Sequence, residues 1–225
     1  MGPHTGDGAA WVFSTRADGD LAVDAPGVDG ARSRLLAAAG GPAVPWSWLR
    51  QVHGARVVVA DRPAAHEGTE ADAIVAERPG VPVAVQTADC GAVVLTSPEG
   101  VVAAAHAGWR GLAAGVVEAT VAAMRDRGAG AVTAHVGPMI HPECYEFGAE
   151  DLAAVADVLG PTVVGRTAGG SPALDVPAAV DAALARAGVA VASRSPGCTA
   201  CDPQRWYSHR ARREAGRMAA VVWAT

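Results

Sequence analysis

The chain has 225 residues, and half of them are hydrophobic, which excludes an intrinsically disordered protein and suffices for one buried core. We therefore predict a single domain over residues 1–225. The formal net charge of −5 offers no general attraction for a nucleic-acid backbone, so we expect no nucleic-acid partner.

Short apolar runs rich in valine alternate with turn residues along most of the chain. Runs of this length, bounded by Gly, Pro or Asp, are typical of β-strands. A short strand is expected just before Arg16. The remaining predicted strands, in chain order, are residues 56–60, 73–76, 82–87, 92–96, 101–106 and 131–137.

Four segments carry apolar residues at helical spacing. They are residues 30–39, 112–127, 149–159 and 176–187. Asp175 precedes Val-Pro and is a suitable N-cap for the last of these helices. The stretch 160–172 is rich in Gly and Pro, and we predict a surface loop there.

The predicted strands outnumber the helices and often follow one another directly. Pro98-Glu-Gly100 joins two of them at hairpin distance. This order argues against a regular βαβ repeat. We therefore predict an α/β (α+β) fold: a layered sandwich of mixed β-sheets flanked by helices.

The chain carries no sign of export or membrane insertion. Its apolar stretches are far shorter than the about 20 residues that cross a bilayer. The first residues lack a basic segment followed by an apolar one, and four cysteines are too few for a disulfide scaffold. We expect a cytoplasmic protein with reduced thiols and no membrane partner.

Three residues of metal-ligand type stand at the ends of apolar runs, each close to a glycine: His53, Cys90 and His106. Two imidazoles and one thiolate form a zinc-ligand set whose fourth coordination position is open. Their spacing is not a compact zinc-finger signature. For each residue taken alone the alternative is a structural role, since a lone buried Cys is usually a small hydrophobe.

The pair Cys198-Thr-Ala-Cys201 competes for the role of functional site, because a Cys-x-x-Cys motif begins many zinc and redox sites. A second pair is absent from the sequence, where Cys144 stands alone. The motif follows Ser-Pro-Gly and precedes Asp-Pro, which favours a structural turn over a redox site.

Two arginines are candidate phosphate ligands. Arg110 opens the helix after His106, and Arg16 follows the N-terminal strand. A guanidinium binds phosphate through two hydrogen bonds, although an ordinary ion pair is the alternative for each. Asp89 either orients a metal-bound imidazole or serves as a turn residue.

Five motifs then appear in a characteristic order: Arg50-Gln-Val-His-Gly54, Thr87-Ala-Asp-Cys90, His106-Ala-Gly-Trp-Arg-Gly111, Gly137-Pro with Cys144-Tyr-Glu-Phe-Gly148, and Cys198-Thr with Gly216-Arg-Met-Ala219. In these motifs the chain resembles the bacterial laccase-domain, or polyphenol-oxidase-type, purine nucleoside phosphorylases. The resemblance implies a fold similar to that of toxin-type cysteine deamidases and a zinc ion on His53, Cys90 and His106.

The same resemblance implies the reactions and the partners. These are phosphorolysis of adenosine, inosine, guanosine and methylthioadenosine, and hydrolytic deamination of adenosine, so purine nucleosides and phosphate are the expected partners. The chain departs from the family pattern after Arg16, after Cys90 and around His141. These departures bear on substrate preference more than on the metal ligands.

Two other functions stay open. The first is a copper-dependent polyphenol oxidase; the chain has seven His and no His-x-His pair, but two His and one Cys also suit a single copper site. The second is a hydrolase or amidase acting on a peptide or a cell-wall precursor, with Cys90 as nucleophile and His106 as base.

Overall fold

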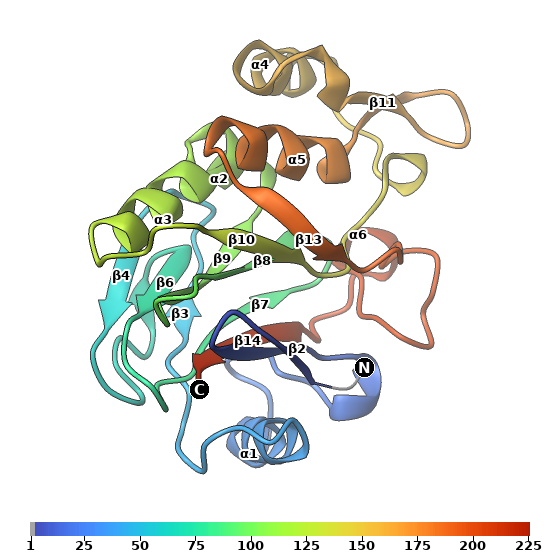
Figure 1. The fold of residues 1–225 in the computed structure, drawn as a ribbon. Helices are drawn as coiled ribbons and strands as arrows, with labels where there is room; N and C mark the ends of the chain where they lie inside the picture. Colours follow the sequence, from blue (N-terminus) through green and yellow to red (C-terminus); the bar gives the residue numbers. More distant parts are fainter. Residues whose placement is uncertain (1–2) are drawn as a thin grey trace.

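The fold is seen in a computed structural model that describes residues 3–225. Two β-sheets pack face to face, and helices cover both outer faces (Figure 1). The larger sheet has the strand order β13-β10-β8-β9-β6-β4, and the smaller has the order β1-β2-β14-β7. This arrangement confirms the predicted layered sandwich of mixed sheets and helices.

The strands of the larger sheet are β4 (Val57–Ala60), β6 (Ala73–Ala76), β8 (Gly91–Thr96), β9 (Val102–Ala107), β10 (Thr133–Val136) and β13 (Ala190–Arg194). Those of the smaller sheet are β1 (His4–Gly6), β2 (Ala9–Phe13), β7 (Val83–Thr87) and β14 (Met218–Ala224). Two short pairs lie outside these sheets: β3 (Leu49–Arg50) with β5 (Thr69–Glu70), and β11 (Val164–Arg166) with β12 (Pro172–Leu174).

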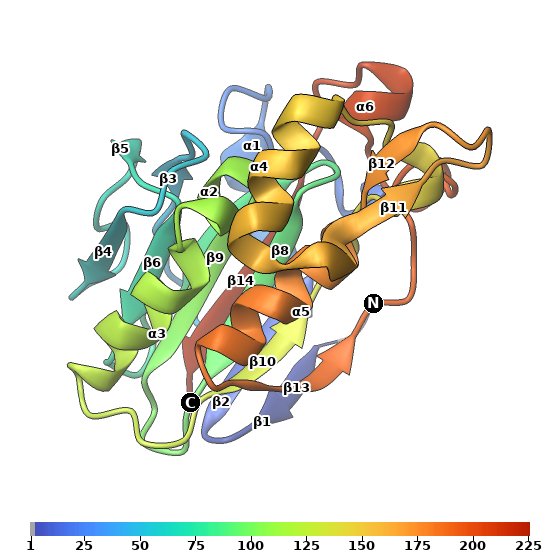
Figure 2. The same ribbon diagram turned by 90° about the horizontal axis from the view of Figure 1, so that it is seen from above.

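The helices are α1 (Val28–Ala38), α2 (Trp109–Ala113), α3 (Val116–Arg125), α4 (Ala149–Leu159), α5 (Val176–Arg186) and α6 (His209–Arg212). Three short 3₁₀ helices are η1 (Arg16–Asp18), η2 (Pro142–Cys144) and η3 (Pro161–Val163). Helix α1 packs on the smaller sheet, while α3 and α5 lie across the larger sheet with α4 outside them (Figure 2).

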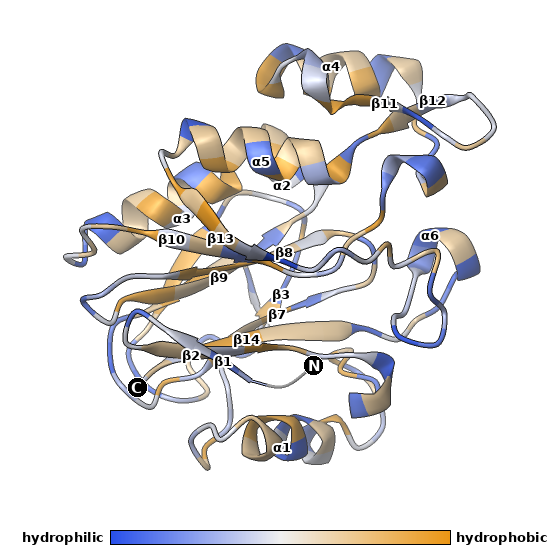
Figure 3. Ribbon diagram, turned by 45° about the vertical axis from the view of Figure 1, so that its right-hand side comes forward, coloured by the Kyte–Doolittle hydropathy of each residue, from blue (hydrophilic) through white to orange (hydrophobic). Residues whose placement is uncertain are grey.

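Both faces of the central strands β6, β8 and β9 are buried, and this explains why these strands are continuous apolar runs in the sequence. On β9, Val102 and Ala104 face the smaller sheet, whereas Ala103 and Ala105 face the helices. Side chains alternate between the faces of a strand, so both sets of positions need apolar residues. Figure 3 shows the strands mainly in hydrophobic colours. His106 continues the series of Val102 and Ala104 and therefore points toward the smaller sheet.

The six strands predicted from residue 56 onward all form, with ends shifted by no more than two residues. Three differences are informative. The segment predicted as one helix over 112–127 is divided into α2 and α3, because Gly115 has a φ of 85°. The predicted loop at 160–172 is wrong: it contains η3 and β11 and ends in β12. Strand β14, at the middle of the smaller sheet, was not predicted.

Two other local predictions are confirmed, the cap at Asp175 and the hairpin around Pro98-Glu-Gly100. Asp175 caps α5, since its Oδ1 accepts a hydrogen bond from the N–H of Ala178 at 2.9 Å. Strands β8 and β9 form an antiparallel pair around Pro98-Glu-Gly100. A membrane-crossing helix is not found within residues 3–225, where every helix falls short of the length and apolar content that a bilayer requires.

His135 on β10 is a structural histidine. Its ring stacks on Trp11 with centroids 3.7 Å apart, and its Nδ1 lies 2.9 Å from the hydroxyl of Ser193. Burial lowers the pKa of His135 to about 4, against a partial opposing effect of Asp7. The folded chain therefore holds this imidazole neutral under conditions in which the unfolded chain protonates it.

The free energy of unfolding should consequently rise with pH between about 4 and 6.5, because the unfolded state binds the extra proton only in that window. Urea unfolding of the wild type and of His135→Gln at pH 4.5 and pH 7 measures this. We expect the rise to be smaller in the variant. An equal pH dependence in both proteins would contradict the buried, neutral imidazole.

Candidate functional site

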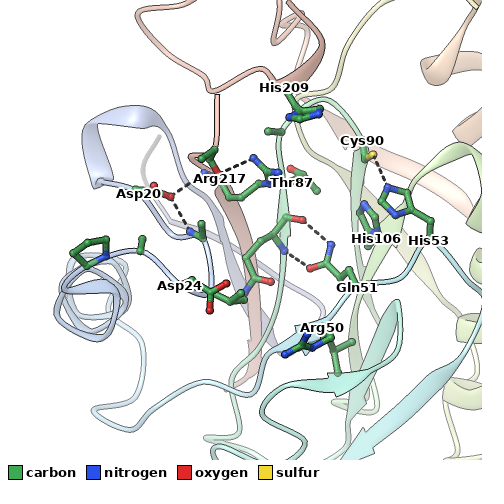
Figure 4. A pocket seen from close by; sticks show the side chains of 18 residues that line it. Asp20, Asp24, Arg50, Gln51, His53, Thr87, Cys90, His106, His209 and Arg217 are labelled. Carbon is green, nitrogen blue, oxygen red and sulfur yellow. Dashed lines mark hydrogen bonds between the residues drawn. The ribbon is translucent and has the colours of Figure 1, made fainter. Parts of the chain in front are cut away.

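Figure 4 shows His53, Cys90 and His106 side by side, although they come from three separate segments. Their potential ligand atoms all lie within 4.8 Å of one another. The Sγ of Cys90 is 3.8 Å from Nε2 of His53, and the two imidazole rings lie nearly perpendicular, with centroids 4.8 Å apart. The structure therefore brings together the three ligands that the sequence suggested.

The donor set fits a metal ion. A tetrahedral zinc centre with usual Zn–N and Zn–S bond lengths separates a nitrogen ligand from a sulfur ligand by about 3.6 Å. The separation of 3.8 Å between His53 and Cys90 is close to that value. Imidazole and thiolate are also ligands that copper accepts, so the site is compatible with either metal.

The buried carboxylate of Asp72 organises this site. Its Oδ1 accepts hydrogen bonds from Nδ1 of His106 at 2.8 Å and from the backbone N–H of His53 at 2.9 Å. Its Oδ2 accepts from the backbone N–H groups of Gly54 and Val52, at 2.7 and 3.2 Å. Because Nδ1 of His106 donates to Asp72, the ring's Nε2 is the atom left for a metal.

The carboxylate keeps its charge despite complete burial. Burial alone raises the pKa of Asp72, but the hydrogen bonds from His106 and from Gly54 outweigh it, and the net pKa is lowered. Sequence reasoning missed this residue. Its one local signal is an acid set directly before the apolar run of β6, a position that resembles those of the three proposed ligands.

Cys90 and His106 stabilise each other's charged forms. Burial raises the pKa of the Cys90 thiol, but the charge of His106 and hydrogen bonds from His106 and His53 lower it to about 6. Burial lowers the pKa of His106, whereas the Cys90 thiolate and Asp72 raise it to about 9. The thiolate is the form that binds metals and the form that acts as a nucleophile.

Two glycines of the motif at 106–111 let the backbone approach the site. A Cβ on Gly108 would lie 2.6 Å from Cδ2 of His53 and 3.4 Å from the Cys90 sulfur. A Cβ on Gly111 would lie 2.8 Å from the carbonyl oxygen of Gly54. Any larger residue at either position would push the His53 loop away from the other two ligands.

A cavity of about 660 Å³ opens beside the three ligands. Its volume is within the usual range of small-molecule sites. Besides His53, Cys90 and His106, its polar wall includes Asp20, Asp24, Arg50, Gln51, Gln86, Thr87, His209 and Arg217 (Figure 4). Paired hydrogen bonds between Gln51 and the backbone of Gln86, at 2.7 and 2.8 Å, fix the wall next to β7.

The two predicted phosphate ligands, Arg16 and Arg110, are not among the residues that line this cavity. The guanidinium of Arg16 donates to the carboxylate of Glu214 and lies 4.2 Å from the centre of the Tyr207 ring. Arg110 is exposed and lies 4.1 Å from the centre of the Trp109 ring. Among the described residues, the arginines that line the cavity are Arg50 and Arg217.

Asp89 supports a turn and does not contact an imidazole. Its Oδ1 accepts a hydrogen bond from the hydroxyl of Thr199, and its Oδ2 accepts one from the backbone N–H of Arg210, both at 2.6 Å. The residue has a φ of 95°, in the region that favours glycine, and these two contacts hold it there. Orientation of the imidazole belongs to Asp72.

Replacement of Asp72 by Asn should weaken metal binding by roughly 10- to 100-fold, because the amide cannot accept all four hydrogen bonds that position His53 and His106. Elemental analysis after dialysis against a weak chelator measures the loss. Asp61→Asn, at an exposed acid paired with Arg62, is the matched control. Equal metal retention in both variants would show that Asp72 does not position the ligands.

Comparisons with known proteins assign the chain to a family. Residues 16–225 match the family described as multi-copper polyphenol oxidoreductase laccase. A purine nucleoside phosphorylase of Streptomyces coelicolor is 41% identical over 227 residues, which cover 99% of this chain and 86% of that protein. A purine nucleoside phosphorylase of Xylella fastidiosa is 40% identical over 213 residues, covering 90% of this chain and 81% of that protein.

Solved structures show the same architecture. A Neisseria meningitidis protein of family DUF152 superimposes with a TM-score of 0.85 at 29% identity, covering 99% of this chain and 98% of that one. YlmD of Geobacillus stearothermophilus superimposes with a TM-score of 0.81 at 26% identity, covering 96% and 92%. On the match over residues 16–225 and the two relatives of 40% and 41% identity, this chain belongs to the multi-copper polyphenol oxidoreductase laccase family, whose members include proteins named purine nucleoside phosphorylases.

Proposed function

We propose that this protein is a zinc-dependent purine nucleoside phosphorylase that acts on adenosine, inosine, guanosine and methylthioadenosine and also deaminates adenosine. The observation that carries the proposal is the convergence of His53, Cys90 and His106 on the wall of a cavity of ligand size. The names of the relatives support phosphorolysis. The ligand set supports zinc.

A zinc ion held by His53, Cys90 and His106 would supply Lewis-acid chemistry at the cavity wall. The chain's own residues position the reactants. Asp72 holds both histidines in place. The carboxylates of Asp20 and Asp24 line the opposite part of the cavity, where they can accept hydrogen bonds from ribose hydroxyls or from a purine amino group.

In phosphorolysis, a phosphate oxygen bonds to C1′ of the ribose as the bond from C1′ to the purine nitrogen breaks. The purine leaves with the electron pair and takes up a proton, and ribose 1-phosphate remains. Arg50 and Arg217 line the cavity and offer guanidinium groups for the phosphate. They join Arg16 and Arg110, the candidates from the sequence.

In deamination, water adds at C6 of the adenine ring of adenosine, ammonia leaves and inosine remains.

Incubation of the pure protein with adenosine, followed by chromatography, tests both reactions. We expect adenine and ribose 1-phosphate only when phosphate is present, and inosine without it. Cys90→Ser and His106→Ala should each lose one equivalent of zinc relative to the wild type and at least 100-fold of both activities, because each removes one of three ligands. His66→Ala, at an exposed histidine outside this site, is the matched control. A zinc content equal to that of the wild type in both site variants would reject the metal assignment.

Arg50→Ala should raise the KM for phosphate roughly tenfold and leave deamination of adenosine unchanged, because its guanidinium lines the cavity and a charge-assisted hydrogen bond contributes about 1.5–3 kcal/mol. The sequence candidates are tested by the same measurement on Arg110→Ala and Arg16→Ala. Arg62→Ala, at an exposed site, is the control. An equal loss of phosphorolysis and deamination in Arg50→Ala would count against a phosphate role for this residue.

One observation favours a second candidate, a metal-free hydrolase or amidase acting on a peptide or a cell-wall precursor. Cys90, His106 and Asp72 are arranged as nucleophile, base and orienting acid. Inactivation by iodoacetamide that a chelator does not reproduce would favour this reading. The family description also names a copper oxidase, which is a further alternative. Copper bound to the Cys90 thiolate would give an intense absorption band in the visible range, whereas zinc would not.

We further infer one domain over residues 1–225, a cytoplasmic location and small-molecule partners. The shared core between the two sheets supports the single domain. All four cysteines are free thiols, which supports a reducing compartment.

A further inference from the structure

A second group of cysteines lies outside the His53–Cys90–His106 site. Cys144, on η2, meets Cys198 and Cys201, in the turn after β13, and the three Sγ atoms lie within 4.8 Å of one another. The Sγ atoms of Cys144 and Cys201 are 3.4 Å apart. This corrects the sequence reading, in which Cys144 stands alone and the other two merely form a turn.

Backbone contacts hold the two cysteine-bearing segments side by side. Met139 forms a parallel bridge with Cys198, and the N–H of Thr199 donates to the carbonyl of Met139 at 3.1 Å. The N–H of His141 donates to the sulfur of Cys198 at 3.4 Å. Contacts of this kind, in which a backbone N–H points at a sulfur, also surround metal-bound cysteines.

We propose that Cys144, Cys198 and Cys201 form a second metal site, which binds a zinc ion through three thiolates. In a tetrahedral zinc site with Zn–S bonds of about 2.3 Å, two sulfurs lie about 3.8 Å apart. The observed separations, from 3.4 Å up to the 4.8 Å limit, bracket that value. A disulfide would require a sulfur separation of about 2.05 Å.

A cationic side chain lies beside the cluster, and one of its three cysteines faces solvent. Arg212 donates from Nη1 to the carbonyl of Ala200 at 2.9 Å and from Nη2 to that of Thr199 at 3.2 Å, which places a guanidinium on the turn between two of the ligands. Cys198 is buried, Cys144 is half-buried and Cys201 is exposed. The cluster is thus reachable from solvent on the Cys201 side, where water can complete the coordination.

This second site would be structural, and it would help to hold the turn that carries Cys90, a ligand of the first site. Thr199, between the two turn ligands, donates its hydroxyl to Asp89, the residue before Cys90. Tyr145, next to Cys144, packs against the guanidinium of Arg210, whose backbone N–H also donates to Asp89. A metal ion joining the two segments would hold both supports of the Asp89–Cys90 turn.

Elemental analysis of the full chain, purified under reducing conditions and dialysed against zinc buffered by a weak chelator, tests the proposal. We expect two zinc ions per wild-type chain and one in Cys201→Ser, whose exposed position makes it tolerant of substitution. Cys144→Ser, from the other segment, should behave in the same way. Cys90→Ser should also hold one, at the second site. A zinc content unchanged from that of the wild type in both Cys201→Ser and Cys144→Ser would overturn the proposal, whatever the occupancy of the first site.

Cobalt substitution separates the two sites. In Cys90→Ser, cobalt(II) should still give a near-ultraviolet thiolate-to-metal absorption band, and adding Cys201→Ser to this variant should abolish it. Circular dichroism of each variant verifies folding. Absence of the band in folded Cys90→Ser, or an intact mass showing a disulfide between Cys144 and Cys201 in the reduced preparation, would overturn the proposal and leave the first site unaffected.

Discussion

The carboxylate of Asp72 is the contact on which the geometry of the candidate site depends. It joins the loop of His53 to the imidazole of His106 through four hydrogen bonds, and it does so with no exposure to solvent. A buried charge without partners is costly, and loss of one partner from a buried pair destabilises a protein by about 3–5 kcal/mol. Four hydrogen bonds offset the cost of burying the Asp72 charge. Because the carboxylate needs all four donors, it also fixes the positions of His53 and His106.

The place of the site follows from the packing of the two sheets. Because side chains alternate along β9, His106 points toward the smaller sheet. Cys90 directly precedes β8, the strand that pairs with β9. Loops at this end of the sandwich leave a cavity where the apolar core between the sheets stops. The strands are thus a rigid support for two ligands, while His53 comes from a loop that Asp72 restrains.

The turn of Asp89 and Cys90 lies between two groups of potential metal ligands. On one side, Cys90 itself faces His53 and His106. On the other, Thr199 ties Asp89 to the segment that carries Cys198 and Cys201. Asp89 has a φ of 95°, and its side-chain contacts help to hold this conformation. Order in the second cluster and geometry in the first are therefore linked through one strained residue.

Local pattern predicted the strands of the larger sheet except β13, most helices, the cap at Asp175 and the three candidate ligands. Because both faces of the central strands are buried, these strands are continuous apolar runs in the sequence. A His or Cys at the end of such a run can therefore be identified from the sequence as a candidate ligand. Tertiary structure alone decided the role of Asp72, the cavity wall at Asp20 and Arg217, and the meeting of Cys144 with Cys201. These contacts join residues separated by 34, 197 and 57 positions, and strand pairing and sheet packing, which local pattern does not encode, bring them together.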